Sequence, residues 1–131
     1  MSYFKGLGSD CAIVEKVKGE AESAGRADIN GCYLGRSMRI EVKTPDNRNK
    51  PSKIQLWDLL RWNKAGAICM VVYSVETVQT AIEHFHGDRH DYTIYPEKNN
   101  CKSIIMYPYC GITYEALYHM YYKGDADEVQ D

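Results

Sequence analysis

The chain has 131 residues, the size of one compact domain, and 44% of them are hydrophobic, which allows a modest core. No apolar run reaches the roughly 18 residues that span a bilayer, and the N-terminus lacks the apolar run of a signal peptide. We therefore expect no membrane association and a cytoplasmic location, or the host cytoplasm for a phage protein.

Charge is unevenly distributed along the chain. The net charge is −2, but residues 125–131 contain four acids and no base. Residues 36–64 contain eight bases and only three acids. A basic segment of this kind suits a polyanionic partner such as nucleic acid, although a solvated charged surface has the same composition.

The first third of the chain predicts three strands. Residues 11–17 are β-branched and apolar and predict a strand, and the glycine-containing stretch 18–26 predicts a loop. Residues 27–33 and 36–44 predict a hairpin that turns at Leu34-Gly35.

The position of this turn decides which side chains face each other. A two-residue turn at Leu34-Gly35 places Asp28 opposite Glu41, whereas a turn at Asn30-Gly31, also a strong turn pair, does not. Two opposed carboxylates repel each other, so the pair calls for a proton or a cation. Oxygen ligands suit Mg²⁺ or Mn²⁺. Lys43 shares the face of Glu41, although an exposed, salt-bridged strand has the same spacing.

The middle of the chain predicts a strand–helix–strand unit. Ser52 is a suitable N-cap for a helix over residues 53–65, and Gly66 suits the position after its end. The apolar run 67–73 predicts a strand buried on both faces and parallel to the strand before the helix.

The last part of the chain predicts a further helix, a hairpin and a final helix. Their expected ranges are 75–85 for the helix, 92–95 and 103–107 for the hairpin strands, and 113–122 for the final helix, with a disordered acidic end. The predicted fold is α/β (α+β), with a central mixed sheet flanked by helices. We expect a core over residues 1–86 and a C-terminal appendage over residues 87–131.

Four motifs in this order carry a family resemblance: Gly25 to Asp28, Ile40 to Pro45, the pair Ser52 and Gln55, and residues 65–74. Together they resemble the VRR-NUC family of the PD-(D/E)XK nuclease superfamily, over about residues 25–80. The resemblance implies a restriction-endonuclease-like core. The implied activity is that of a hydrolase, a metal-dependent DNA endonuclease.

The resemblance assigns roles residue by residue. Asp28 and Glu41 correspond to metal-binding carboxylates, and the carbonyl of Val42 to a third ligand of Mg²⁺ or Mn²⁺. Lys43 corresponds to the catalytic lysine and Gln55 to a catalytic glutamine on the following helix.

Further expectations concern the substrate and its binding. DNA is the expected partner, contacted by Arg26, Arg48, Lys50 and Lys53. Cleavage selective for junctions or branched DNA, as in relatives, favours a homodimer, because a two-fold substrate needs two sites. Members of this family usually have an N-terminal helix with a further acidic residue. Here no such helix is predicted, and the acids available instead are Glu15, Glu20 and Glu22.

Other functions remain open at this stage. One is a sequence-specific or nicking endonuclease, and another is a non-catalytic nucleic-acid-binding module with a degenerate nuclease site. Tyrosines are concentrated late in the chain, where they predict core packing, an interface, or a platform on which bases stack. We expect Trp57 and Trp62 in the core or an interface. The segment that contains His84, His86 and His90 favours a polar loop over a zinc site.

Overall fold

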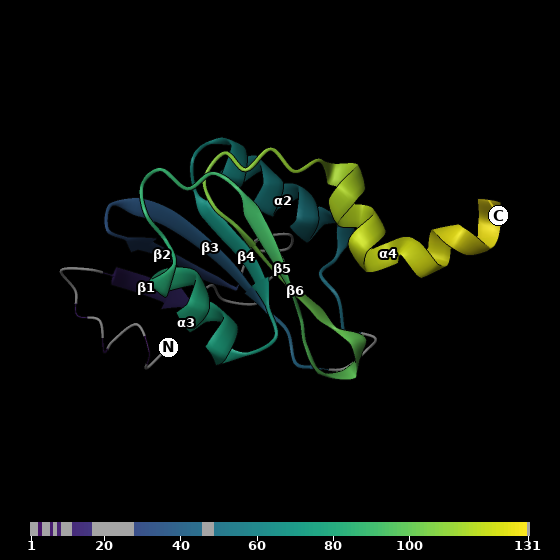
Figure 1. The fold of residues 1–131 in the computed structure, drawn as a ribbon, viewed down its shortest axis with the longest axis horizontal. Helices are drawn as coiled ribbons and strands as arrows, with labels where there is room; N and C mark the ends of the chain where they lie inside the picture. Colours follow the sequence, from purple (N-terminus) through teal and green to yellow (C-terminus); the bar gives the residue numbers. More distant parts are fainter. Residues whose placement is uncertain are drawn as a thin grey trace.

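The fold is a six-stranded mixed sheet with three helices, shown in a computed structural model (Figure 1). The structure describes residues 12–16, 28–45 and 49–130, together with Tyr3, Gly6 and Gly8. The mixed sheet and its helices confirm the predicted α/β class. Within the described residues, no helix is long and apolar enough to cross a membrane.

The strand order of the sheet is β1-β2-β3-β4-β6-β5. Strands β3 and β4 are parallel, and every other neighbouring pair is antiparallel. The parallel pair lies at the centre of the sheet. Parallel neighbours need a long crossover connection, which here contains a helix that covers one face of the sheet. The strands are β1 (Ala12–Lys16), β2 (Ile29–Tyr33), β3 (Arg36–Val42), β4 (Ile68–Val72), β5 (Tyr92–Pro96) and β6 (Lys102–Met106).

Helices cover both faces of the sheet (Figure 1). Alternate residues of β4 point to opposite faces. Cys69 and Val71 belong to the core cluster formed with α2 and α4, and Met70 and Val72 belong to the cluster formed with α3. The helices are α2 (Lys53–Lys64), α3 (Val75–Glu83) and α4 (Tyr114–Gln130).

The hairpin of β2 and β3 turns at Leu34-Gly35. Ile29 pairs with Ile40 and Tyr33 with Arg36, so the turn has two residues. Both turn residues have positive φ, 50° at Leu34 and 84° at Gly35, which is the backbone of a type I′ turn. The alternative turn at Asn30-Gly31 is excluded because these residues lie inside β2.

Leu34 is a poor residue for this turn. It is 58% exposed, so its side chain gains little from packing, and a positive φ is costly for a residue with a branched apolar side chain. We expect Leu34→Asn to raise the free energy of unfolding by about 1 kcal/mol, because asparagine tolerates this backbone. Urea denaturation measures the change. Leu34→Ala serves as the control, because alanine keeps the cost of a positive φ at this position. An equal gain in both variants would assign the effect to loss of exposed apolar surface.

The crossover from β3 to β4 follows the prediction closely. Ser52 accepts a hydrogen bond from the backbone N–H of Gln55, and the Gln55 side chain accepts one from the backbone N–H of Ser52, which together form a capping box. Gly66 follows the C-cap Ala65 with φ of 109°. A Cβ at Gly66 would lie 2.7 Å from the Tyr109 hydroxyl, so glycine is required there.

The C-terminal elements are more closely integrated than an appendage. Strand β6 is hydrogen-bonded to β4 as well as to β5, so the predicted second hairpin belongs to the central sheet. Helix α4 runs to Gln130, beyond the predicted end at residue 122. Ala126, Glu128 and Gln130 have high helix propensity, which favours this continuation.

Buried Asn63 of α2 holds the C-terminal segment against the central unit. Its Nδ2 donates to the carbonyls of Ala67 (3.0 Å), Met106 (3.2 Å) and Tyr107 (2.9 Å). Its Oδ1 accepts from the N–H of Cys110 (3.2 Å). One side chain therefore satisfies backbone groups of β6 and of the following loop, which fixes α2 against them.

Candidate active site

The candidate site lies where the two parallel central strands end. The register pairs Glu41 with Val71 and Val42 with Val72. The backbone N–H of Lys43 donates to the carbonyl of Val72 (2.9 Å), which continues the ladder one residue beyond β3. The backbone of Lys43 is therefore held as firmly as that of the strand before it.

Glu41 is the buried acid of the site. It is 1% exposed and lies on the sheet face covered by α2, because it alternates with Ile40 on the α3 face. The Lys43 Nζ lies 3.2 Å from the Glu41 Oε2. The Oε1 is buried and has no hydrogen-bond partner among the described residues. A buried carboxylate oxygen without a partner is costly and indicates a missing proton or cation.

The pKa of Glu41 agrees with this geometry. This pKa is raised from 4.5 to about 7, mainly by burial of the carboxyl group and further by the negative charge of Asp28. The ammonium of Lys43 acts in the opposite direction, but it does not cancel the other two effects. Glu41 is therefore poised between its protonated and charged forms near neutral pH.

Asp28 directly precedes β2. Its Oδ2 accepts a hydrogen bond from the backbone N–H of Val42 (3.0 Å). The register continues from the pair Ile29 and Ile40, which brings Asp28 opposite Glu41, as the hairpin arithmetic predicted. The Asp28 carboxylate thus reaches across to β3 and lies close enough to perturb the pKa of Glu41.

The residues fit a hard divalent cation with few protein ligands. Across residues 12–16, 28–45 and 49–130, no group of three or more His, Cys, Asp and Glu side chains is arranged to hold a metal ion. Two neighbouring carboxylates, one with an unpartnered buried oxygen, still suit Mg²⁺ or Mn²⁺, which usually keep several waters and use substrate phosphate as a ligand. The role of the Val42 carbonyl as a third ligand stays a prediction.

Gln55 lies at the start of α2 and is used differently from the prediction. Its Oε1 accepts from the backbone N–H of Ser52 (2.8 Å) in the capping box, so the side-chain oxygen is used by the helix terminus. The hydrogen bond uses the side-chain oxygen, so the amide nitrogen keeps both hydrogens for another acceptor. Its catalytic role stays a prediction.

Two substitutions at Gln55 separate capping from catalysis. Gln55→Glu keeps the capping box, whereas Gln55→Ala removes it and should lower the free energy of unfolding by about 1 kcal/mol. If the amide acts in the reaction, both variants lose DNA cleavage. If Gln55 serves the helix alone, Gln55→Glu cleaves like the parent. Thermal unfolding and a cleavage assay on the same preparations distinguish these results.

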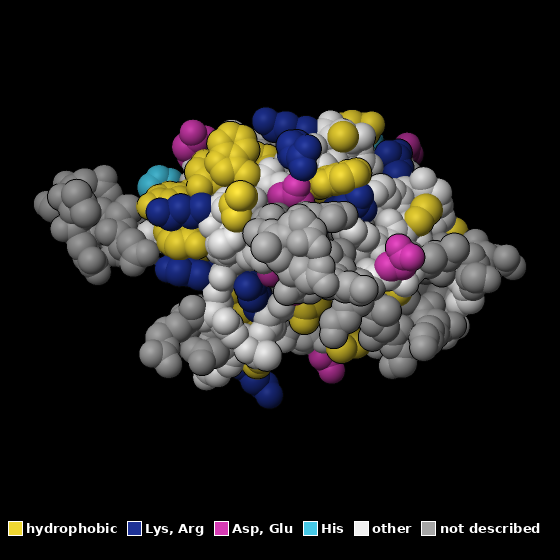
Figure 2. Space-filling model, turned by 180° about the vertical axis from the view of Figure 1, so that it is seen from behind, with side chains coloured by type: hydrophobic (Ala, Val, Ile, Leu, Met, Phe, Trp, Pro, Cys, Tyr) yellow, Lys and Arg dark blue, Asp and Glu magenta, His cyan; other side chains and the backbone are white. Residues whose placement is uncertain are grey.

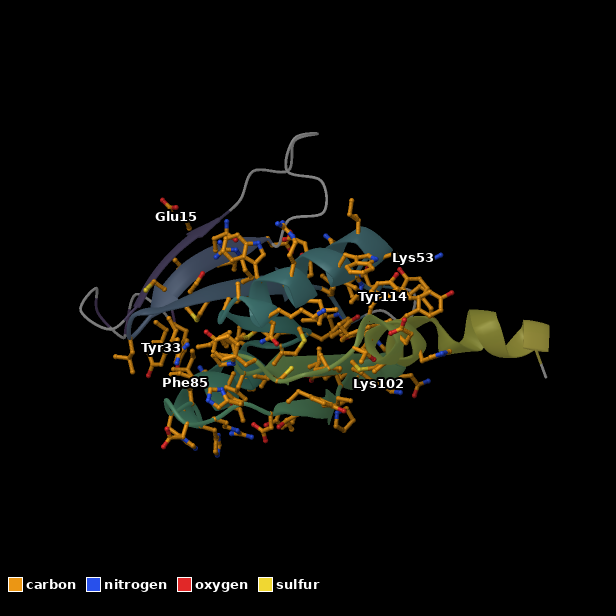
Figure 3. The ribbon with its side chains drawn as sticks, turned by 90° about the horizontal axis from the view of Figure 1, so that it is seen from above. Glu15, Tyr33, Lys53, Phe85, Lys102 and Tyr114 are labelled. Atoms are coloured by element: carbon orange, nitrogen blue, oxygen red, sulfur yellow. The ribbon has the colours of Figure 1, made fainter. Side chains whose placement is uncertain are left out.

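Several predicted site residues lie elsewhere or outside the described residues. Glu15 is exposed on the edge strand β1, where it pairs with Asn30, and it projects away from the sheet in Figure 3. It therefore does not join Asp28 and Glu41. The remaining acids Glu20 and Glu22, the loop over residues 18–26, and the predicted DNA contacts Arg26 and Arg48 lie outside the described residues.

A cavity of about 670 Å³ opens beside the site, mainly on the other face of the sheet. Asp28 and Lys43 line it, but Glu41 does not, because it points to the α2 face. Most of the wall is apolar, formed by residues of β3, β4 and α3 that include Ile40, Val72 and Val78. The cavity therefore reaches the edge of the carboxylate site and does not enclose it.

The histidine-containing segment after α3 is a polar loop, as predicted. His84 Nδ1 lies 2.9 Å from the Thr80 carbonyl, and His90 Nδ1 lies 2.7 Å from the Pro108 carbonyl. Arg89 pairs with Asp91 at 2.8 Å. These contacts tie the loop to its neighbours and leave no shared metal position.

Lys50 and Lys53, two of the predicted DNA contacts, lie on an aromatic surface that the sequence predicts only in part. The Nζ of Lys50 lies 4.1 Å from the ring centre of Tyr122, and that of Lys53 lies 5.6 Å from the ring centre of Tyr118. Trp57 is 54% exposed and stacks on Tyr114, so it lies outside the core, and the expected alternative of an interface stays a prediction. The four-residue spacing of Tyr114, Tyr118 and Tyr122 was the available signal.

Comparison with protein-family models, with curated proteins and with solved structures finds no significant match to this chain.

Proposed function

We propose that this protein is a metal-dependent endonuclease that hydrolyses phosphodiester bonds in DNA. The observation that carries the proposal is the buried Glu41 with an unpartnered oxygen, beside Asp28 and Lys43 at the ends of two parallel strands. The resemblance to the VRR-NUC family, within the PD-(D/E)XK superfamily and its restriction-endonuclease-like core, supports the same reaction.

The proposed roles follow from the contacts of the three side chains. Asp28 and Glu41 hold Mg²⁺ or Mn²⁺, with the Val42 carbonyl as a further ligand. When bound, such an ion acts as a Lewis acid on the phosphate and lowers the pKa of a coordinated water. Lys43 lies 3.2 Å from Glu41 and orients the attacking water or stabilises negative charge on the phosphate. Hydrolysis in line with the leaving oxygen gives a product with a 5′-phosphate.

Cleavage assays with several DNA forms test the proposal. Purified protein is incubated with linear duplex, single-stranded, branched and four-way-junction DNA, each with Mg²⁺, Mn²⁺ or EDTA. We expect cleavage that requires the metal and is faster on branched substrates, and a dimer by light scattering. A defined fragment pattern on plasmid DNA would instead favour a sequence-specific or nicking enzyme. Cleavage that persists unchanged in EDTA contradicts the metal-dependent mechanism.

The second candidate is a nucleic-acid-binding module with a degenerate nuclease site. The capping contact of Gln55 favours it, because the side-chain oxygen is bound to the backbone N–H of Ser52. The two carboxylates also lack a third acidic partner among the described residues. This function predicts salt-sensitive DNA binding without turnover in Mg²⁺ or Mn²⁺.

A further inference from the structure

Aromatic rings form a continuous series across α2 and α4. Trp57 and Tyr114 are stacked, with ring centres 4.7 Å apart and 18° between their planes. Tyr114 and Tyr118 lie 6.1 Å apart, and Tyr118 and Tyr122 are stacked at 5.1 Å and 13°. Most aromatic side chains of a small domain are buried in its core, whereas this series ends at Trp57 with 54% of that side chain exposed.

Basic side chains lie along the same series. Lys50 and Lys53 stand on either side of the N-cap Ser52 and place their ammonium groups over the rings of Tyr118 and Tyr122. The first turn of α2 contains no acidic residue, and Lys53 forms no ion pair with any residue that the structure describes. The first turn of α4 contains one acid, Glu115.

The two kinds of side chain form one surface, which we call the aromatic–basic surface. Figure 2 shows yellow hydrophobic and dark-blue basic side chains side by side on the left of the view, and Figure 3 shows Lys53 and Tyr114 close together. The Tyr122 hydroxyl donates to the carbonyl of Pro51 (2.7 Å), so α4 is held against the segment that leads into α2. The surface consists of Lys50, Lys53, Trp57, Tyr114, Tyr118 and Tyr122.

We propose that the aromatic–basic surface binds an unpaired nucleic-acid strand, with bases stacked on Trp57 and phosphates held by Lys50 and Lys53. Stacking requires bases free of a partner strand, and exposed rings with neighbouring cations are how proteins bind single strands without reading sequence. A paired duplex presents phosphates to the lysines but hides the faces of its bases. The proposal concerns binding alone and does not depend on the proposed nuclease activity.

The surface lies at the same end of the sheet as the candidate site. The segment from Lys43 to Ser52 joins the end of β3 directly to α2, and the Tyr73 hydroxyl donates to the carbonyl of Asn49 (2.6 Å) within that segment. Lys50 and Lys53 therefore come shortly after the strand that carries Glu41, at the start of α2. If the nuclease proposal holds, this placement favours substrates with a single-stranded part.

Binding in EDTA tests the proposal separately from catalysis. Fluorescence anisotropy measures the dissociation constants of the full chain for a labelled 20-nucleotide oligothymidylate and for a duplex of equal length. We expect tighter binding of the single strand. Trp57→Ala should weaken that binding by roughly 5- to 150-fold, and Trp57→Phe should retain most of it. Lys53→Ala should remove one phosphate contact. In a plot of log affinity against log salt concentration, the magnitude of the slope should therefore fall by about 0.7.

Lys64→Ala is the matched control, because Lys64 is an exposed lysine at the other end of the same helix. It should leave the preference for single strands unchanged. Equal affinity for single strand and duplex, or parent-like binding by Trp57→Ala, overturns the proposal. So does a dimer that dissociates on Trp57→Ala without loss of DNA binding, since the rings would then cover a second copy of the chain. Thermal unfolding of each variant confirms that the fold is retained.

Discussion

Glu41→Gln lowers the rate of metal-dependent DNA cleavage by at least about 100-fold, if the proposed site is the reaction centre. The substitution keeps the size of the side chain and removes the charge that would hold a cation. Lys43→Ala should have an effect of similar size, because the ammonium 3.2 Å from Glu41 is lost. Single-turnover cleavage of a labelled branched DNA in Mg²⁺ measures both effects.

Two substitutions of the same chemical kind away from the site provide controls. Glu83→Gln changes an exposed acid at the end of α3, and Lys64→Ala changes an exposed base at the end of α2. Both should cleave like the parent. Parent-like rates for Glu41→Gln or Lys43→Ala would remove these residues from the mechanism and favour the binding-module function.

In the absence of metal, the protein should lose stability as the pH rises from about 4.5 to above 7. Glu41 has a folded-state pKa of about 7 and an ordinary value of 4.5, so the folded state binds the proton more tightly. The favourable contribution is complete below pH 4.5 and is lost as the pH rises through 7. A shift of this size corresponds to about 3 kcal/mol, which makes Glu41 a large contributor to pH dependence.

Urea denaturation at pH 5 and pH 8 in EDTA measures this effect as a difference between proteins. Glu41→Gln cannot ionise, so its stability should fall less between the two pH values than that of the parent, by about 2.5 kcal/mol. Glu83→Gln should follow the parent. Addition of Mg²⁺ or Mn²⁺ at pH 8 should stabilise the parent and not Glu41→Gln, because a bound cation favours the charged carboxylate. The same pH dependence in parent and Glu41→Gln would show that Glu41 titrates normally.

Local patterns in the sequence predicted most of the secondary structure. The capping residues Ser52 and Ser74, the apolar run that became β4 and the alternation in β3 each act over a few residues, so they are readable without the fold. Helix α4 extends to Gln130, beyond the predicted end at residue 122.

Tertiary contacts decided the features that depend on distant segments. The sequence left two turns open, and the choice of Leu34-Gly35 follows from pairing along the whole hairpin. The sequence left open whether Trp57 lies in the core or at an interface, because its exposure depends on where α4 packs, and no local pattern in α2 specifies that.

The sequence by itself determined that Glu41 and Lys43 share a strand face, because side chains in a strand alternate with a period of two. With the turn at Leu34-Gly35, the same alternation also places Asp28 opposite Glu41. Only the tertiary structure decided that Glu41 is buried with one oxygen unpartnered, because burial depends on α2 covering that face of the sheet. The tertiary structure likewise brought Lys53 of α2 to Tyr118 of α4, which lie 65 residues apart in the chain and are adjacent only through packing.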